Sequence, residues 1–351
     1  MATGIQATDP RSAFYHELER LHMSPLWESL GVLVPHAPNG PCVPALWKWH
    51  EVLPFIERAG ELITAEEAVR RVLILENPAL PGQSSVTQSL YAGLQLILPG
   101  EVAPAHRHVQ SALRFVVHGS GAYTAVDGER TSMSPGDFII TPSWTWHDHG
   151  NLGIDGMAGP VVWLDGLDIP IVRFFDAGFE EKGAAKSQGV SRPEGNAWAR
   201  YGQNLLPVDY VSSSKTSPIF NYPYERSREV LYRLYRDGEL DDWHGVKLRY
   251  VNPATGGWPM PTMAAFIQYL PREFTGKPFR ATDGAVYSVV EGSGRAIVDG
   301  AAFEFGPKDH FVVPSWKVCV LQADEDTVLF SFSDRSAQAA LGILREEKIA
   351  D

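Results

Sequence analysis

The amino-acid sequence predicts a protein dominated by β-structure and built by duplication of one β domain. Short β-like runs alternate with glycine and proline turns from Ser85 to Val126, a rhythm typical of a sandwich or a barrel. Two segments then recur: RFVVHGSGAYTAVDG (114–128) as YSVVEGSGRAIVDG (287–300), and DFIITPSW (137–144) as DHFVVPSW (309–316). Self-similarity at one separation of about 170 residues indicates two copies of the same folding unit.

Helices are expected mainly at the N-terminus and between the two copies. Pro10 to Met23 has helical spacing with Asp9 as N-cap, and Ala65 to Val72 follows Thr64 with the spacing of a capping box. Arg226 to Asp237 predicts a third helix. A shift to glycine, serine, lysine and asparagine marks the connector between domains, which covers 176–222.

Strands are expected in two further places. Trp47 and Trp49 alternate around Lys48 as in a strand, and Val161 to Leu164 is an apolar run of strand length. The resulting division has four segments: an N-terminal decoration (1–72), a first β domain (73–175), a linker with a helix (176–245) and a second β domain (246–351).

Length and composition restrict the class of protein. The 351 residues are 44% hydrophobic and carry a formal net charge of −12 without a basic stripe, so we expect no nucleic-acid partner. Cys42 and Cys319 provide no disulfide framework and fit a reducing compartment. No apolar run approaches a membrane span, and the N-terminus lacks a signal-peptide core. We therefore expect a soluble, cytoplasmic protein.

Three histidines in the first copy have the spacing of metal ligands. His106 and His108 form an H-x-H pair, and alternate residues of a strand point to the same face. His147 follows a second apolar run, Asp137 to Thr141. Three imidazoles from adjacent strands leave open positions on a metal, which a metal that binds substrate needs. Zinc and nickel suit three histidines as well as iron, so the spacing alone does not name the metal.

The two blocks around these histidines resemble the two cupin motifs. The matching positions are Gly100, His106, His108 and Gly119 in the first motif, and Gly136, Pro142, His147 and Asn151 in the second. Ala112 replaces the motif's glutamate, and Trp144 replaces its second glycine. The resemblance implies a bicupin, two double-stranded β-helix jelly rolls with N-terminal and linker helices. Because the carboxylate is missing, the metal would keep its full double charge and favour an anionic bidentate ligand.

The second copy lacks this metal chemistry. In the repeat, His106 aligns with Phe279, His108 with Ala281 and His147 with Cys319. We therefore expect a metal-free domain that serves packing and assembly.

Longer segments resemble the gentisate 1,2-dioxygenase family, with its salicylate and 1-hydroxy-2-naphthoate dioxygenase relatives. They are RRVLILENPALPGQSSVTQSLYAGLQLILPGEVAPAHRHVQSALRFVV (70–117), PSWTWHDHGN (142–151) and VVWLDGLDIP (161–170). The resemblance implies an Fe(II)-dependent enzyme that opens an aromatic hydroxy acid with O2 between its carboxyl- and hydroxyl-bearing carbons. It also implies one iron per chain, in the N-terminal cupin, and a homotetramer.

The resemblance also assigns roles. His106, His108 and His147 would bind iron. Arg114 lies an even number of residues beyond His108, on the same strand face, and resembles the arginine that holds the substrate carboxylate. His149 would bond to the ring hydroxyl or take its proton.

Four further side chains resemble pocket residues of the family. Arg70 resembles a second carboxylate or entrance arginine, although Arg71 is an alternative. Gln95 and Asp165 resemble pocket-wall and supporting groups. Tyr91 takes an aromatic position where salicylate-cleaving relatives carry tryptophan and gentisate enzymes carry tyrosine.

Tyr91 thus favours gentisate as substrate and maleylpyruvate as product. The alternatives are a salicylate or 1-hydroxy-2-naphthoate 1,2-dioxygenase, a metal-dependent cupin isomerase or decarboxylase, and a non-catalytic binding bicupin. Only the dioxygenases consume O2, and a non-catalytic bicupin predicts degraded ligands in both halves.

Overall fold

The computed structural model describes residues 9–153, 159–212 and 214–349. The chain forms two units, one ending at Asn39 and the other beginning at Gly40. The first unit contains α1 (Pro10–Arg20) and α2 (Leu26–Leu33). The expected N-cap is present, since the Asp9 carboxylate accepts a hydrogen bond from the backbone N–H of Arg11 at 3.3 Å.

In the second unit, two antiparallel sheets form the N-terminal copy. The six-stranded sheet has the order β12-β8-β5-β10-β3-β2, and the five-stranded sheet has the order β11-β4-β9-β6-β7. The bounds are β2 (Val72–Ile74), β3 (Tyr91–Ile97), β4 (Val102–His108), β5 (Ala112–His118), β6 (Ala122–Val126), β7 (Glu129–Ser132), β8 (Phe138–Thr141), β9 (His147–Asn151), β10 (Val161–Leu167), β11 (Glu180–Lys182) and β12 (Asn221–Tyr222).

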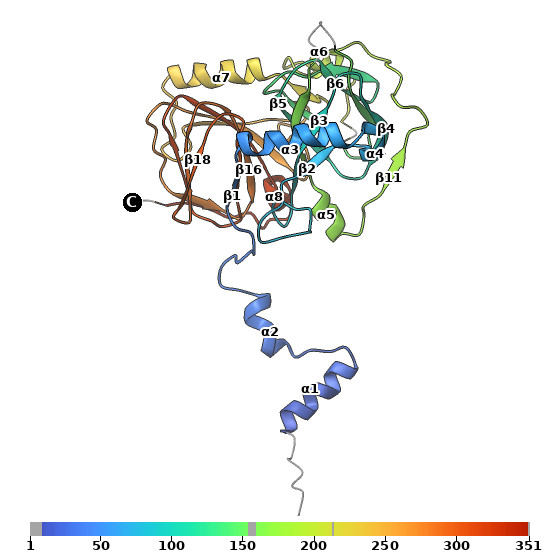
Figure 1. Cartoon of the computed structure of the whole chain (residues 1–351). Helices are drawn as coiled ribbons and strands as arrows, with labels where there is room; N and C mark the ends of the chain where they lie inside the picture. Colours follow the sequence, from blue (N-terminus) through green and yellow to red (C-terminus); the bar gives the residue numbers. More distant parts are fainter. Residues whose placement is uncertain (1–8, 154–158, 213, 350–351) are drawn as a thin grey trace, which may run out of the picture. The chain divides into compact units, whose positions relative to one another are not determined.

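Two more sheets form the C-terminal copy in the same pattern. Their orders are β1-β19-β16-β21-β14-β13 and β18-β17-β20-β15-β22. The bounds are β1 (Ala45–Trp47), β13 (Val246–Arg249), β14 (Ala264–Leu270), β15 (Phe279–Ala281), β16 (Ala285–Glu291), β17 (Gly294–Val298), β18 (Ala301–Phe305), β19 (His310–Val313), β20 (Cys319–Ala323), β21 (Thr327–Ser333) and β22 (Glu346–Lys348). The duplicated, mainly β architecture expected from the sequence is confirmed (Figure 1).

Helices of the second unit lie outside the sheets (Figure 1). They are α3 (Trp49–Leu62), α4 (Ala65–Ala68), α5 (Ile169–Phe174), α6 (Asn196–Tyr201), α7 (Tyr224–Arg236) and α8 (Arg335–Ala340). Helix α4 is shorter than the expected Ala65 to Val72, because Val72 already begins β2. Its N-cap is present, since Thr64 Oγ1 accepts a hydrogen bond from the Glu67 N–H at 3.2 Å. In the described residues, no helix has the length and apolar character needed to cross a membrane.

The strand expected around Trp49 is wrong. Trp47 ends β1, and Trp49 begins α3, where its N–H donates to the Asp309 carboxylate at 2.7 Å. Two alternating residues are too few to define a strand period. The longer pattern is helical, since Trp49, Val52 and Ile56 are three and four residues apart and pack on the core.

A continuous core joins the two copies within the second unit. Phe115 of β5 stacks on Phe330 of β21 with ring centroids 4.1 Å apart and planes inclined by 6°. Phe138 of β8 packs on the same ring at 5.4 Å. These buried rings hold one face of the N-terminal six-stranded sheet in place. Successive residues of a strand point to opposite faces, so Arg114, which precedes Phe115, faces the interior of the N-terminal copy.

Candidate functional site: a three-histidine metal centre

The three histidines with ligand spacing come together on two paired strands. His106 and His108 lie on β4, His147 lies on β9, and His106 is directly opposite His147 in the ladder. Their ring centroids are 4.0 Å (106–147), 4.8 Å (108–147) and 5.1 Å (106–108) apart. One nitrogen from each ring lies within 4.8 Å of the others, and no second such group of three potential ligands occurs in the described residues.

The hydrogen bonds of these rings leave the Nε2 atoms for a metal. The Nδ1 atoms bond to backbone carbonyls, that of His106 to Pro104 at 3.2 Å, that of His108 to Gln110 at 2.8 Å and that of His147 to Thr145 at 2.8 Å. A carbonyl only accepts, so in His108 and His147 Nδ1 carries the proton and Nε2 presents its lone pair. His106 Nδ1 also contacts the Arg70 guanidinium group, which only donates, so the carbonyl is not its sole neighbour. Among the described residues, His147 Nε2 is buried without a hydrogen-bond partner, as expected of an atom positioned to bind a metal.

Burial keeps these imidazoles neutral. It lowers the pKa of His106 to about 2 and that of His108 to about 4, with a smaller contribution from nearby arginine charges. The pKa of His147 is also far below its ordinary value, first because of burial. Neutral imidazole is the metal-binding form. The donor set therefore fits a divalent metal such as zinc, iron or nickel.

Arg114 lies on the inward face of β5, opposite Asp165 of β10. It does not share a strand with His108, although the even offset predicted that it would, because β4 ends at His108 and β5 belongs to the other sheet. Its side chain is 4% exposed, its Nη1 donates to Thr141 Oγ1 at 2.6 Å, and its Nε lies 3.6 Å from Asp165 Oδ1. Asp165 also accepts a hydrogen bond from Trp163 Nε1 at 3.0 Å. Burial raises the pKa of Asp165 to about 6, although Arg114 opposes the shift. Nη2 of Arg114 has no hydrogen-bond partner among the described residues.

The structure separates the two candidate arginines before β2. Arg71 is turned away and forms a two-pronged ion pair with Glu101, at 2.7 and 3.0 Å. Arg70 contacts the ring of His106 and lies 3.4 Å from the Pro104 carbonyl. Arg70 is therefore the arginine beside the histidine cluster, whereas Arg71 is engaged by Glu101.

His149 is next to the centre on β9, with its ring 5.7 Å from that of His147. Its Nδ1 lies 2.9 Å from Thr124 Oγ1, whose hydroxyl donates to the sulfur of Met133. A hydroxyl has one proton, so Thr124 accepts from Nδ1–H and leaves the lone pair on Nε2. That Nε2 is buried and unpartnered. Burial, and then the charge of Arg114, hold the pKa of His149 well below its ordinary value.

Gln95 and Tyr91 share the inward face with Arg114. On β3, Gln95 is opposite Trp163 and Tyr91 is opposite Leu167, at even offsets from Asp165. Both side chains are buried. The pKa of the Tyr91 hydroxyl is raised first by burial and then by the charge of Asp165. The predicted site residues other than Arg70, which precedes β2, thus lie on strands of the N-terminal copy.

Thr124, Thr141 and Trp163 carry polar contacts that the sequence did not assign to the site. Thr124 is opposite His149 in the β6–β9 ladder, and Thr141 ends β8 beside Arg114. Threonine is common in strands, so only cross-strand register distinguishes these two from ordinary strand residues.

Comparison with known proteins agrees with the geometry. Residues 93–165, which contain the histidine cluster and Arg114, match the Cupin domain family. The chain is 52% identical over 341 residues to gentisate 1,2 dioxygenase 1 of Aquipseudomonas alcaligenes, covering 97% of each chain. This chain belongs to the gentisate 1,2-dioxygenase family. The family predicted from the sequence is therefore confirmed, and the protein is a ring-cleaving dioxygenase.

Relatives of this dioxygenase differ in the acid for which they are named. The 5-aminosalicylate 1,2-dioxygenase of a Comamonas species is 36% identical and covers 96% of this chain and 90% of its own length. The crystal structure of salicylate 1,2-dioxygenase from Pseudoaminobacter salicylatoxidans with gentisate superposes with a TM-score of 0.90 at 34% identity. It covers 100% of this chain and 98% of the other. The bicupin fold is thus confirmed across the whole dioxygenase.

Proposed function

We propose that this dioxygenase opens gentisate between its carboxyl- and hydroxyl-bearing carbons with O2, giving maleylpyruvate, and that it uses one Fe(II) per chain. The observation that carries the proposal is the three-imidazole cluster, with Arg114 on the inward face of β5 and Arg70 in contact with the ring of His106. The substrate assignment rests on the 52% identical relative named for gentisate.

His106, His108 and His147 would hold the iron, which when bound supplies an electron path between ring and O2 and a Lewis acid for the substrate oxygens. The surrounding charges favour an anion even without the metal. Arg70 and Arg114 carry two positive charges, Asp165 is the buried negative charge beside them, and the imidazoles are neutral. The charge of Glu180 also acts on Arg70, but Glu180 is exposed to solvent, which screens it. A hydroxy acid that binds as a carboxylate and gives up its hydroxyl proton offsets this excess.

Arg114 is suited to hold the substrate carboxylate. Asp165 and Thr141 fix one side of the guanidinium group, while Nη2 remains without a partner. A planar, permanently charged donor of fixed orientation positions a carboxylate better than a flexible ammonium group. Arg70 adds a second positive charge near His106.

His149 is suited to take the proton of the substrate 2-hydroxyl. Its Nε2 lone pair is free because Thr124 orients the other nitrogen. The ring stays neutral at cellular pH because its pKa is lowered. An approaching anionic substrate offsets the positive charge of Arg114, which makes protonation of His149 easier.

A second candidate function is salicylate or 1-hydroxy-2-naphthoate cleavage. It is favoured by the TM-score of 0.90 to salicylate 1,2-dioxygenase and by a 36% identical relative named for 1-hydroxy-2-naphthoate. Tyr91 on the pocket wall favours gentisate by the resemblance of its position. Gentisate also carries a second ring hydroxyl, which makes its ring easier to oxidise.

The test is anaerobic reconstitution with Fe(II), followed by O2 uptake with gentisate, salicylate and 1-hydroxy-2-naphthoate. Samples loaded with zinc or nickel are the controls. We expect uptake only with iron, a larger kcat/KM for gentisate than for salicylate, and iron near one per chain. Activity that does not consume O2 would favour an isomerase or decarboxylase, and two irons per chain would contradict a single metal centre.

We further propose a homotetramer in the cytoplasm. Helix α2 carries apolar side chains that are exposed in the single chain, among them Trp27 at 62% and Leu33 at 65%, as expected of a surface that another chain covers. Cys42 and Cys319 are both buried free thiols, consistent with a reducing compartment. Light scattering on the purified enzyme measures the oligomeric mass.

A further inference from the structure

The C-terminal cupin keeps an open interior where the N-terminal cupin has its metal centre. A cavity of about 360 Å³ lies there, lined in part by Phe279, Ala281 and Tyr287. Phe279 is opposite Cys319 in the β15–β20 ladder, just as His106 is opposite His147. The metal ligands are therefore replaced by apolar or small side chains, but the space has not been filled.

Lys247 brings a positive charge to this interior from a different strand than Arg114 does in the N-terminal copy. Tyr287 occupies the place of Arg114, because Tyr287 is opposite Ser331 on β21 as Arg114 is opposite Asp165 on β10. Lys247 on β13 is opposite Gln268. The equivalent pair of the N-terminal copy is Val72 on β2 opposite Gln95, so Lys247 takes the place of Val72. One copy thus presents an arginine and the other a lysine, from two different strands, into equivalent interiors.

Lys247 has no ionic partner. Its ammonium nitrogen lies 4.9 Å from the ring centre of Phe266 and 5.8 Å from that of Tyr287. Among the described residues, no carboxylate forms an ion pair with it and no acceptor takes a hydrogen bond from it. Burial lowers its pKa to about 8, with the charge of Asp283 acting in the opposite direction, so the ammonium form still dominates at neutral pH.

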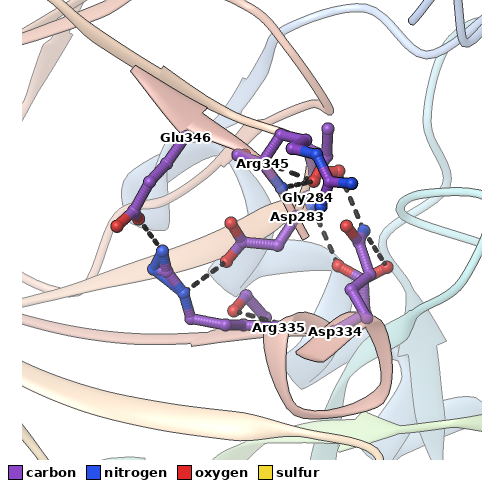
Figure 2. A network of polar contacts seen from close by, with 9 residues as sticks. Asp283, Gly284, Asp334, Arg335, Arg345 and Glu346 are labelled. Carbon is purple, nitrogen blue, oxygen red and sulfur yellow. Dashed lines mark hydrogen bonds and ion pairs between the residues drawn. The ribbon is translucent and has the colours of Figure 1, made fainter. Parts of the chain in front are cut away.

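The carboxylates around the cavity are already paired with other cations. Figure 2 shows Arg335 between Asp283 and Glu346, with the Arg335 Nε 3.9 Å from Asp283. Glu347 accepts a hydrogen bond from Arg280 Nε at 2.7 Å. The carboxylates that line the cavity are therefore engaged by arginines, and among the described residues none of them forms an ion pair with Lys247.

We propose that the interior of the C-terminal cupin binds a small organic carboxylate with a flat ring. Its carboxylate would bond to Lys247 and to the Tyr287 hydroxyl, which has no hydrogen-bond partner among the described residues. Its ring would pack on Phe279 and Val313, which also line the cavity. A volume near the lower end of the usual range for ligand pockets, about 300–1,000 Å³, suits a single-ring acid. This second site goes beyond the proposed function and does not depend on it.

The experiment is equilibrium dialysis of the iron-loaded enzyme against radiolabelled benzoate, which lacks the hydroxyl needed for cleavage. We expect about two benzoates per chain in the native enzyme, one in each cupin. Lys247→Met should weaken one of them by at least about tenfold, because a charge-assisted bond is lost. It should leave gentisate turnover unchanged, which also shows that the variant is folded. Lys247→Arg should restore binding to within a few-fold.

Two matched variants make the result specific. Lys317 lines the same cavity but is paired with Asp299 at 2.9 Å, so Lys317→Met should bind as the native enzyme does. Arg114→Met should lose only the other benzoate. One benzoate per chain, lost in Arg114→Met and retained in Lys247→Met, would overturn the second site. Failure of gentisate to support O2 uptake would refute the proposed function and leave this binding result intact.

Discussion

Arg114→Lys tests the central feature of the proposed site, the guanidinium group that holds the substrate carboxylate. Arg114 uses Nη1 on Thr141 and Nε beside Asp165, which leaves Nη2 for the substrate. A lysine keeps the charge but has a single nitrogen for all three roles. Loss of one hydrogen bond to a charged group costs about 1.5–3 kcal/mol. We therefore expect kcat/KM for gentisate to fall by roughly 10- to 150-fold.

The assay is initial-rate O2 uptake, with iron content measured on the same preparation. Arg71→Lys is the matched control, because Arg71 is equally buried but binds Glu101 outside the site. We expect Arg71→Lys to lower the melting temperature while kcat/KM stays within about twofold, since a buried pair acts on stability.

Two results would refute the reasoning for Arg114. A kcat/KM within about twofold of the native value would show that another residue, with Arg70 as the next candidate, holds the carboxylate. Loss of iron in Arg114→Lys would show that the residue supports the metal centre instead.

Four other perturbations follow from the same geometry. His149→Gln should lower kcat by about 10²–10⁴-fold with iron retained, as loss of a general base does; unchanged kcat would exclude the role. Tyr91→Trp should lower the ratio of kcat/KM for gentisate to that for salicylate, and a native ratio at or below one would overturn the substrate assignment. The pKa of Asp165 is raised to about 6, so kcat/KM should fall as the pH drops below about 6, because protonation removes the anion beside Arg114. In Asp165→Asn this fall should be absent. His310→Phe should raise stability by about 1–3 kcal/mol, because both ring nitrogens are buried without partners and the repeat has Phe138 at this position. Burial lowers the pKa of His310 to about 4, so the native protein loses stability as pH falls from about 6.5 toward 4; thermal melts should show a weaker loss in the variant.

The sequence predicted the cluster of three histidines because their positions follow from short-range spacing. His106 and His108 share a face by strand periodicity, and the second motif placed His147. The choice between Arg70 and Arg71 needed long-range information, since it depends on Glu101, which attracts Arg71 away from the centre. No local pattern records such a pairing.

Some elements of the fold were missed for a similar reason. Helix α3 has a single fully buried residue, Ile56, and contains Pro54, so its helical pattern is weak beside the tryptophan alternation that precedes it. The short strand β11 lies in the polar connector, and its three residues are all exposed. It is defined only by its pairing with β4, which no hydrophobic periodicity signals.

The duplication extends into this connector. β11 pairs with β4, β22 pairs with β15, and both added strands consist of Glu-Glu-Lys. The ion pair across these ladders is the same in both copies, with Arg107 Nε 2.7 Å from Glu181 and Arg280 Nε 2.7 Å from Glu347. The frame of the two cupins is thus alike even outside the segments whose repetition is visible in the sequence.

The same two arginines explain an exception to the cupin motif. Trp144 and Trp316 occupy the motif's glycine position, and both have the positive φ that favours glycine, +59° and +63°. That conformation costs a bulky residue about 1–3 kcal/mol. The guanidinium carbon of Arg107 lies 4.6 Å from the ring centroid of Trp144, and that of Arg280 lies 4.6 Å from the ring centroid of Trp316. Such cation–π contacts stabilise by about 0.5–2 kcal/mol. Both copies thus keep the strained tryptophan and its outward arginine. The two copies differ at the neighbouring inward positions, which are His106 and His108 in one copy and Phe279 and Ala281 in the other. The chemical difference between the cupins therefore lies in the residues that face the interior.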